Sequence, residues 1–171
     1  MTTTRQTTEE GEEEKDPAST LSFPINPAGN FNAAGSISSL LLNNQTQNAQ
    51  YVLAGNWSLL ALNGNITDFK ANFTMVSVDG KQRHIHSLTD FSSNVAAPLI
   101  LDIHGTAFTG ESDITANGTV AWGAVQITVT MAEHDVIRIT IDEPNVSSHF
   151  HNQAIYGVVF SIQEYELFPQ R

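Results

Sequence analysis

The chain has 171 residues, enough for one domain of ordinary size with some chain to spare. Charged residues make up only 15 % of it, against about 25 % in average domains, which excludes a coiled coil or a long helical bundle. A net charge of −11 would repel phosphate backbones, so we expect no nucleic-acid partner. The absence of cysteine excludes disulfides, thiolate-bound metals and thiol catalysis. No apolar run reaches the ~18–20 residues of a membrane span.

Residues 1–20, MTTTRQTTEEGEEEKDPAST, contain six acids, two bases and no large apolar side chain after Met1. Such a segment cannot bury enough apolar surface to offset its chain entropy, so we expect a disordered acidic tail or stalk. A single β domain is then expected over residues 21–171. The tail lacks the basic and apolar regions of a signal peptide. The chain is therefore expected to be either cytoplasmic or the mature part of an exported protein.

Asn-x-Ser/Thr triplets favour export. The chain contains six of them, at Asn44, Asn56, Asn65, Asn72, Asn117 and Asn145. This is about twice the number expected by chance from its composition, and the triplet is a glycosylation acceptor only in exported proteins. We therefore expect an extracellular or cell-surface glycoprotein, with a cytoplasmic β protein rich in Thr and Asn as the alternative.

The segment 23–48 contains Pro24, Pro27 and several glycines, and is expected to wrap the domain irregularly, with one short helix or strand near 37–42. From residue 51 the pattern is that of strands. The first covers 51–62 and ends at Asn63-Gly64, the strongest short hairpin motif. The next covers 66–78, and Asp79-Gly80 turns the chain into a strand at 83–88. Residues 89–98 are expected to form a loop.

In the second half, residues 99–115 are predicted to form one strand bent at Gly110, with two separate strands as the alternative. Further strands are expected over 120–131, 136–141 and 155–167, with a proline-containing loop at 142–153. Seven to nine strands with regularly spaced turns predict an all-β, antiparallel β-sandwich or β-barrel.

Histidines are the candidate functional residues. His84 and His86 are two residues apart on a predicted strand, so both side chains project from the same face. A third ligand could come from His149 or His151, in the loop before the last strand. Neutral imidazoles are ligands for Cu(II) and Zn(II), so a copper or zinc ion is the predicted cofactor. The alternatives are a solvent-exposed pair on the strand and a hydrogen-bonded pair flanking a core Phe150.

Strand counting decides whether the two His-x-His motifs can meet. With one bent strand at 99–115, the strand at 136–141 ends at the same end of the sheet as residue 84. With two strands there it ends at the opposite end, unless the fold is a Greek key. Of the single histidines, His104 is expected to be an ordinary strand residue and His134 to be solvated.

The spacing of His84, His86, Asp90, Pro144 and His149 resembles the cupin metal motif, which implies a jelly roll with three histidines and a carboxylate on one metal. Asp90 stands where that motif has Glu, Val146 replaces its glycine, and the glycine that ends its first half is missing. A cupin-like jelly roll is therefore the alternative fold, and Asp90 or His151 is a possible fourth ligand.

A broader resemblance covers roughly residues 50–160. It is carried by Gly55-Asn56-Trp57, Phe69-x-Ala71-x-Phe73-x-Met75-Val76, Asp79-Gly80, His84-x-His86 and His149-Phe150 followed by Ile155-Tyr156-Gly157. In these motifs the chain is similar to uncharacterised exported β proteins of ammonia-oxidising archaea. The resemblance implies an exported β domain, with His84, His86 and His149 as the residues of interest. By analogy with other exported proteins of such organisms, it favours copper.

Three functions follow from these patterns. The first is an extracellular metal-binding β domain that holds Cu(II) or Zn(II) through His84, His86 and His149. The second is a structural or adhesive surface glycoprotein module without catalysis, which could associate with a cell surface or with itself. The third is a metalloenzyme with an open coordination position. It comes last because no general base is identifiable in the sequence.

Overall fold

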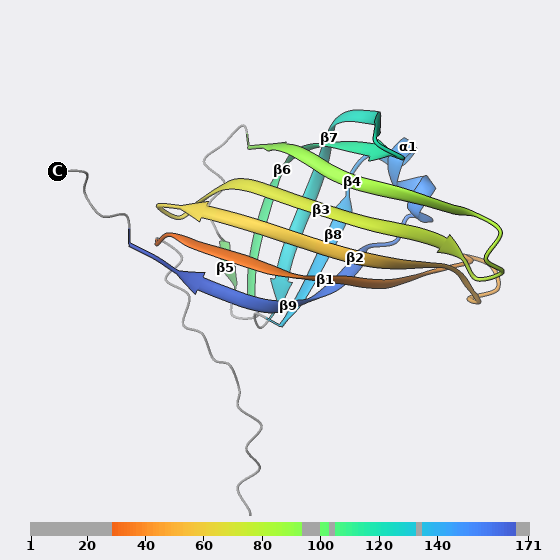
Figure 1. Cartoon of the computed structure of the whole chain (residues 1–171), viewed down its shortest axis with the longest axis horizontal. Helices are drawn as coiled ribbons and strands as arrows, with labels where there is room; N and C mark the ends of the chain where they lie inside the picture. Colours follow the sequence, from red (N-terminus) through yellow and green to blue (C-terminus); the bar gives the residue numbers. More distant parts are fainter. Residues whose placement is uncertain (1–28, 94–99, 103–104, 133–134, 167–171) are drawn as a thin grey trace, which may run out of the picture.

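The computed structural model describes residues 29–93, 100–102, 105–132 and 135–166. The predicted tail at 1–20, His104 and His134 lie outside these residues. The described chain is all-β, as predicted, and is drawn in Figure 1. Its strands are β1 (Phe31–Leu42), β2 (Ala49–Leu62), β3 (Asn65–Ser77), β4 (Arg83–Ser92), β5 (Ile100–Asp102), β6 (Gly105–Ala116), β7 (Thr119–Ala132), β8 (Val136–Ile141) and β9 (Ile155–Glu164). Two short helical turns, α1 (Pro144–Ser147) and η1 (Ser148–Phe150), separate β8 from β9.

The strands form one antiparallel sheet in the order β4-β3-β2-β1-β9-β8-β7-β6-β5. A further pairing between β4 and β6 joins the two sides of this order, so the eight longer strands form a closed ring. Most described neighbours in the sheet are also neighbours in sequence, as in a meander. The jelly-roll alternative is wrong, because a jelly roll is built from Greek keys in which sequential strands are separated.

Residues 31–42 form a complete strand, so the short helix or strand expected near 37–42 is a strand that begins earlier, and the expectation of an irregular segment is wrong for residues 31–36. Its buried side chains alternate with more exposed ones, and Phe31, Ala33, Ile37 and Leu41 all face the core. The spacers are mostly Ala, Gly and Ser, which have weak strand preference and therefore hid the pattern. Pairing with β2 on one side and β9 on the other stabilises the strand despite this weak preference.

The expected loop at 89–98 also begins later than predicted, because β4 continues to Ser92. The strand passes through a bulge at Asp90, which has a left-handed φ of 53°, and the pairing with β6 shifts between Thr89 and Ser92. After the bulge Phe91 points into the core and Asp90 to solvent. The bulge therefore reverses which face of β4 each following residue occupies.

The prediction of one bent strand over 99–115 is wrong, because two strands cover this segment, and they are divided before Gly105 rather than near Gly110. β5 pairs antiparallel with the start of β6, with Asp102 opposite Gly105, whereas β6 runs unbroken through Gly110. Gly110 is required for a different reason: a Cβ there would lie 2.4 Å from the Phe91 ring and 2.6 Å from the Ser92 carbonyl oxygen. β5 and β4 run in the same direction and pair with the same edge of β6. The additional strand therefore does not change the direction of β6, β7 or β8, and β8 still ends where β4 begins.

The core is one cluster of inward-facing side chains from the strands and from the turn before β9. Its largest fully buried members are Phe31, Phe69, Phe73 and Phe150. Phe150 comes from η1, so this turn packs into the end of the closed sheet. Within the described part of the chain, no helix is both long and apolar enough to cross a membrane.

Candidate metal centre

β4 places two histidines at the end of the sheet where this strand begins. His84 pairs with Met75 and His86 with Phe73, both of which face the core. The side chains therefore point inward with the core residues of β3, as the two-residue spacing predicted. His86 is fully buried and His84 is half-buried at the rim. Arg83 and Ile85 project outward and are exposed.

The third histidine comes from the turn between β8 and β9. Pro144 is the first residue of α1, where its missing N–H costs no helical hydrogen bond. Val146 and Phe150 bury themselves beneath the turn, and His149 lies between them, half-buried. The helical turn ends at His151, which has a left-handed φ of 56°. Burial of the two apolar residues therefore fixes the side of the turn from which His149 projects.

Gln153 and His151 tie this turn to the end of β1. The Leu42 N–H donates to Gln153 Oε1 at 3.0 Å, and Gln153 Nε2 donates to the Leu42 carbonyl at 2.7 Å. The same carbonyl accepts a 3.1 Å hydrogen bond from His151 Nδ1. Asn44 Nδ2 donates to the His151 carbonyl at 3.2 Å. Backbone and side chain together hold the His149-bearing turn in one place.

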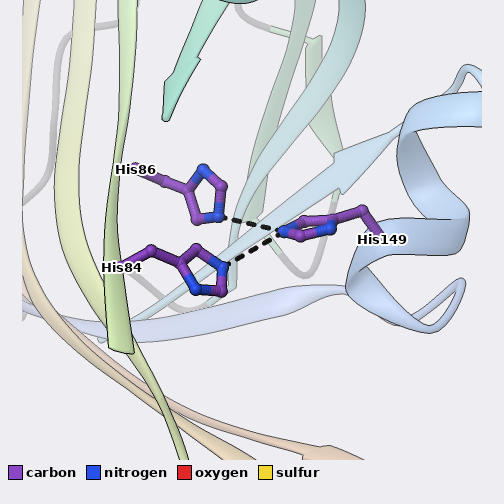
Figure 2. A group of neighbouring side chains, drawn as sticks. All are labelled: His84, His86 and His149. Carbon is purple, nitrogen blue, oxygen red and sulfur yellow. Dashed lines mark hydrogen bonds between the residues drawn. The ribbon is translucent and has the colours of Figure 1, made fainter. Parts of the chain in front are cut away.

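The three histidine rings converge at a single point, as Figure 2 shows. His149 Nε2 lies 3.1 Å from His86 Nε2 and 3.3 Å from His84 Nε2. One potential ligand atom from each ring lies within 4.8 Å of the other two. The sequence prediction that the two His-x-His motifs meet at one end of the sheet is therefore confirmed for these three residues.

The tautomer of His86 is set by the neighbouring strand. His86 Nδ1 lies 2.9 Å from the Thr115 carbonyl oxygen of β6, and a carbonyl can only accept, so Nδ1 carries the proton. In the neutral ring Nε2 then carries no proton, and its lone pair, which could bind a metal ion, points at His149. A histidine whose second nitrogen donates to a backbone carbonyl is the usual arrangement of a metal ligand.

Burial favours the neutral form of His86 and of His149. Burial above all, with smaller contributions from His149 and His84, lowers the pKa of His86 to about 4 against the opposing hydrogen bond to Thr115. Burial, followed by the charges of His84 and His151, also lowers the pKa of His149. Neutral imidazole is the form that binds a metal ion, so His86 and His149 are ready to coordinate at neutral pH.

Aromatic rings surround the nitrogens. The rings of Phe150 and Phe73 lie 5.2 Å and 5.7 Å from that of His86, centroid to centroid. The Trp122 ring lies 5.4 Å from His149 and 6.4 Å from His86. Contact with these rings limits the movement of the imidazoles.

Trp122 is a site residue that the sequence did not predict. The buried residues of β7 are Val125, Ile127, Val129 and Met131, so strict alternation would place residue 122 outside. The β6–β7 register shifts between Ser112 and Ile114, and Ala124 adopts a φ of 50°. The Ala124 N–H is held at 2.8 Å by the Asp113 carboxylate. This bulge turns Trp122 toward the histidines, and a bulge is not visible in an alternating pattern.

The two possible fourth ligands are not brought into the cluster. His151 directs Nδ1 to the Leu42 carbonyl and stacks edge-on against Tyr51, at 5.6 Å between centroids. Asp90 lies in the β4 bulge and is exposed on the outer face. Of the described histidines and acids, only His84, His86 and His149 form a group with metal-ligand spacing.

The asparagines of the six triplets lie at the surface. Asn65 is half-buried, and the exposed ones are Asn44, Asn56, Asn72, Asn117 and Asn145. Four of them make side-chain hydrogen bonds. Asn117 Oδ1 accepts from the Ile85 N–H, Asn72 Nδ2 donates to Ser87 Oγ, and Asn44 and Asn65 donate to the carbonyls of His151 and Asn63.

Comparison with known proteins identifies no relative. No family model matches the chain, and no curated protein or solved structure matches it significantly. The fold and the histidine cluster therefore define the protein only as an all-β protein with a group of three histidines that could hold a metal ion.

Proposed function

We propose that this protein is an extracellular metal-binding β domain that holds one Cu(II) or Zn(II) ion through His84, His86 and His149. The observation that carries the proposal is the convergence of three imidazole nitrogens from two distant parts of the chain. A bond length of about 2.0–2.1 Å to a tetrahedral ion separates ligand nitrogens by about 3.3–3.4 Å. The two separations from His149, 3.1 and 3.3 Å, are close to that value.

The protonation of the three ring nitrogens supports the same proposal. His86 Nε2 carries no proton in the neutral ring, and it faces His149 Nε2, which also faces His84 Nε2. A proton on His149 Nε2 can point at only one of its two neighbours at a time. A single cation between the three nitrogens would satisfy all of them together.

The choice of metal and the location rest on composition. Three imidazoles without a thiolate suit Cu(II) and Zn(II), and the absence of cysteine argues against a Cu(I) or blue-copper centre. The export proposal rests on the six Asn-x-Ser/Thr triplets and on the resemblance to exported archaeal β proteins. If no metal binds, the structural or adhesive surface module is the remaining function.

The experiment uses the full chain, purified without a histidine tag and stripped of metal. A Trp57→Phe variant leaves Trp122 as the single tryptophan, next to the cluster. Cu(II) should quench its fluorescence with a stoichiometry of one, and Zn(II) should compete with that quenching. His84→Ala and His149→Ala should abolish the saturable quenching of Trp122 fluorescence by Cu(II). Unchanged quenching in both variants, or no stoichiometric binding of either metal, would overturn the proposal.

A further inference from the structure

A groove on the outer face of the sheet is separate from the histidine cluster. It has a volume of about 780 Å³ and crosses β9, β1, β2, β3 and β4. Binding sites for small ligands occupy ~300–1,000 Å³, so the groove is large enough to be one. Its polar side chains are outward members of the strands, as the exposure of Asn56, Ser58, Lys70 and Asn72 shows.

Hydroxyl and amide groups line the middle of the groove. Ser36, Asn56, Asn72 and Ser87 are direct cross-strand partners in that order, so they form one polar row over four strands. Asn72 Nδ2 donates to Ser87 Oγ at 2.7 Å, which leaves its Oδ1 free to accept. The Asn56 amide has no hydrogen-bond partner among the described residues and can both donate and accept.

The groove carries no unpaired charge. Lys70 is its single ionisable lining residue, and Lys70 Nζ lies 2.6 Å from the Asp68 carboxylate. An anionic ligand would have to compete with this ion pair, and a cationic ligand finds no acid in the lining. The chemistry of the groove therefore selects a neutral, polar ligand.

Phe160 provides an apolar surface at the side of the groove. β1 pairs Ala34 with Ser161 and Gly35 with Val159, so the register passes over Phe160 and leaves it in a bulge. Its side chain is 70 % exposed, the highest exposure of any large apolar residue in the described chain. Bulges commonly re-aim a side chain near a functional site, and this one presents the Phe160 ring at the side of the polar row.

The strands under the groove restrict how a ligand can bind. β1, β2 and β3 are each paired on both sides, so their backbone N–H and carbonyl groups are already used. A peptide cannot add to them as a further strand, because strand addition needs a free edge. Contacts must therefore come from the side chains of the groove.

The geometry points to a neutral oligosaccharide as the ligand of this groove. A sugar ring has an apolar C–H face that can lie on Phe160, and hydroxyl groups that can exchange hydrogen bonds with Asn56, Asn72 and Ser36. This combination of one aromatic surface with several amide and hydroxyl groups matches the lining. The inference does not depend on the metal site.

The test uses the full chain labelled with ¹⁵N and made in a bacterial host, because Asn56 and Asn72 are also triplet asparagines and must be unmodified. Short soluble oligosaccharides of glucose, mannose, galactose and N-acetylglucosamine are titrated separately. At least one should shift the side-chain amide signals of Asn56 and Asn72 saturably. Phe160→Ala and Asn56→Ala should each weaken that binding by about fivefold or more.

Tyr156→Ala is the matched control, because Tyr156 is an exposed aromatic residue of the same strand outside the groove. It should leave the affinity unchanged. The proposal is overturned if none of the four sugars shifts the two amide signals. It is also overturned if binding is unchanged in the Phe160 and Asn56 variants, or is lost equally in the Tyr156 variant.

Discussion

His86 Nε2 and His149 Nε2 lie 3.1 Å apart, although 63 residues separate them in the chain. The contact exists because β8 ends at the end of the sheet where β4 begins, and because the short turn after β8 packs Phe150 into that end. His84 completes the group from the same strand as His86. The predictions below test this geometry and the packing that maintains it.

Zn(II) should stabilise the metal-free protein. An ion that binds only the folded state at about 100 times its dissociation constant adds about 2.7 kcal/mol to the free energy of unfolding. Thermal unfolding followed by circular dichroism should therefore shift to higher temperature with Zn(II), and His149→Ala should remove the shift. Mg²⁺ is the control ion, because it prefers oxygen ligands and should have no effect.

Acidification should destabilise the metal-free protein through His86. Its pKa is about 4 when folded against 6.5 when unfolded, so between these values the unfolded chain binds a proton that the folded chain does not. The stabilising contribution is complete above pH 6.5 and is lost as the pH falls toward 4. Urea unfolding at pH 7 and pH 5 should show a loss of about 2 kcal/mol from this residue.

His86→Gln is the comparison for this measurement, because an amide can still donate to Thr115 but does not titrate. Carboxylates change equally in both proteins, so the difference between the two pH dependences isolates His86. If the free energy of unfolding changed equally with pH in the two proteins, the buried, neutral state of the His86 ring would be contradicted.

Removing the Gln153 side chain should weaken metal binding without removing a ligand. Gln153 makes two hydrogen bonds with the Leu42 backbone and so holds the turn that carries His149. Gln153→Ala should reduce the affinity for Zn(II) by about tenfold, within the range seen for residues that orient metal ligands. Gln163→Ala, an exposed position on β9, is the control and should bind as the wild type does. Isothermal titration calorimetry measures both.

Asp90 and His151 should be dispensable as metal ligands. Asp90→Ala removes an exposed carboxylate on the outer face, and His151→Asn keeps a donor for the Leu42 carbonyl. Both variants should bind one equivalent of Zn(II). A loss of stoichiometric binding in either one would show that the metal draws this residue into the site.

Gly110→Ala should destabilise the fold by about 1–3 kcal/mol, because a Cβ there would overlap the Phe91 ring and the Ser92 carbonyl oxygen. Gly123→Ala is the matched control, since its nearest neighbour, Asp113 Oδ1, would lie at 3.4 Å. Denaturant unfolding compares the two variants. Equal stability would mean that Phe91 does not pack over Gly110 in solution.

Several features of the protein were determined by sequence alone. Alternating apolar residues and the Asn-Gly and Asp-Gly turns fixed the all-β class and most strands, because side-chain period and turn chemistry are local properties. The two-residue spacing of His84 and His86 was enough to place both rings on one face. Only a short helix or strand near 37–42 was predicted where β1 lies, because the Ala, Gly and Ser spacers of β1 give no local preference and its stability comes from pairing with both neighbours.

Only the tertiary structure decided which residues complete the site. His149 and His151 are equivalent in sequence spacing, but the buried Phe150 between them and the left-handed backbone at His151 send one ring to the cluster and the other to Leu42. Asp90 matched a ligand spacing but lies in a bulge that turns it to solvent, and Trp122 reached the cluster through another bulge. A bulge changes the face of every following residue, and its position depends on the partner strand rather than on the residues that carry it.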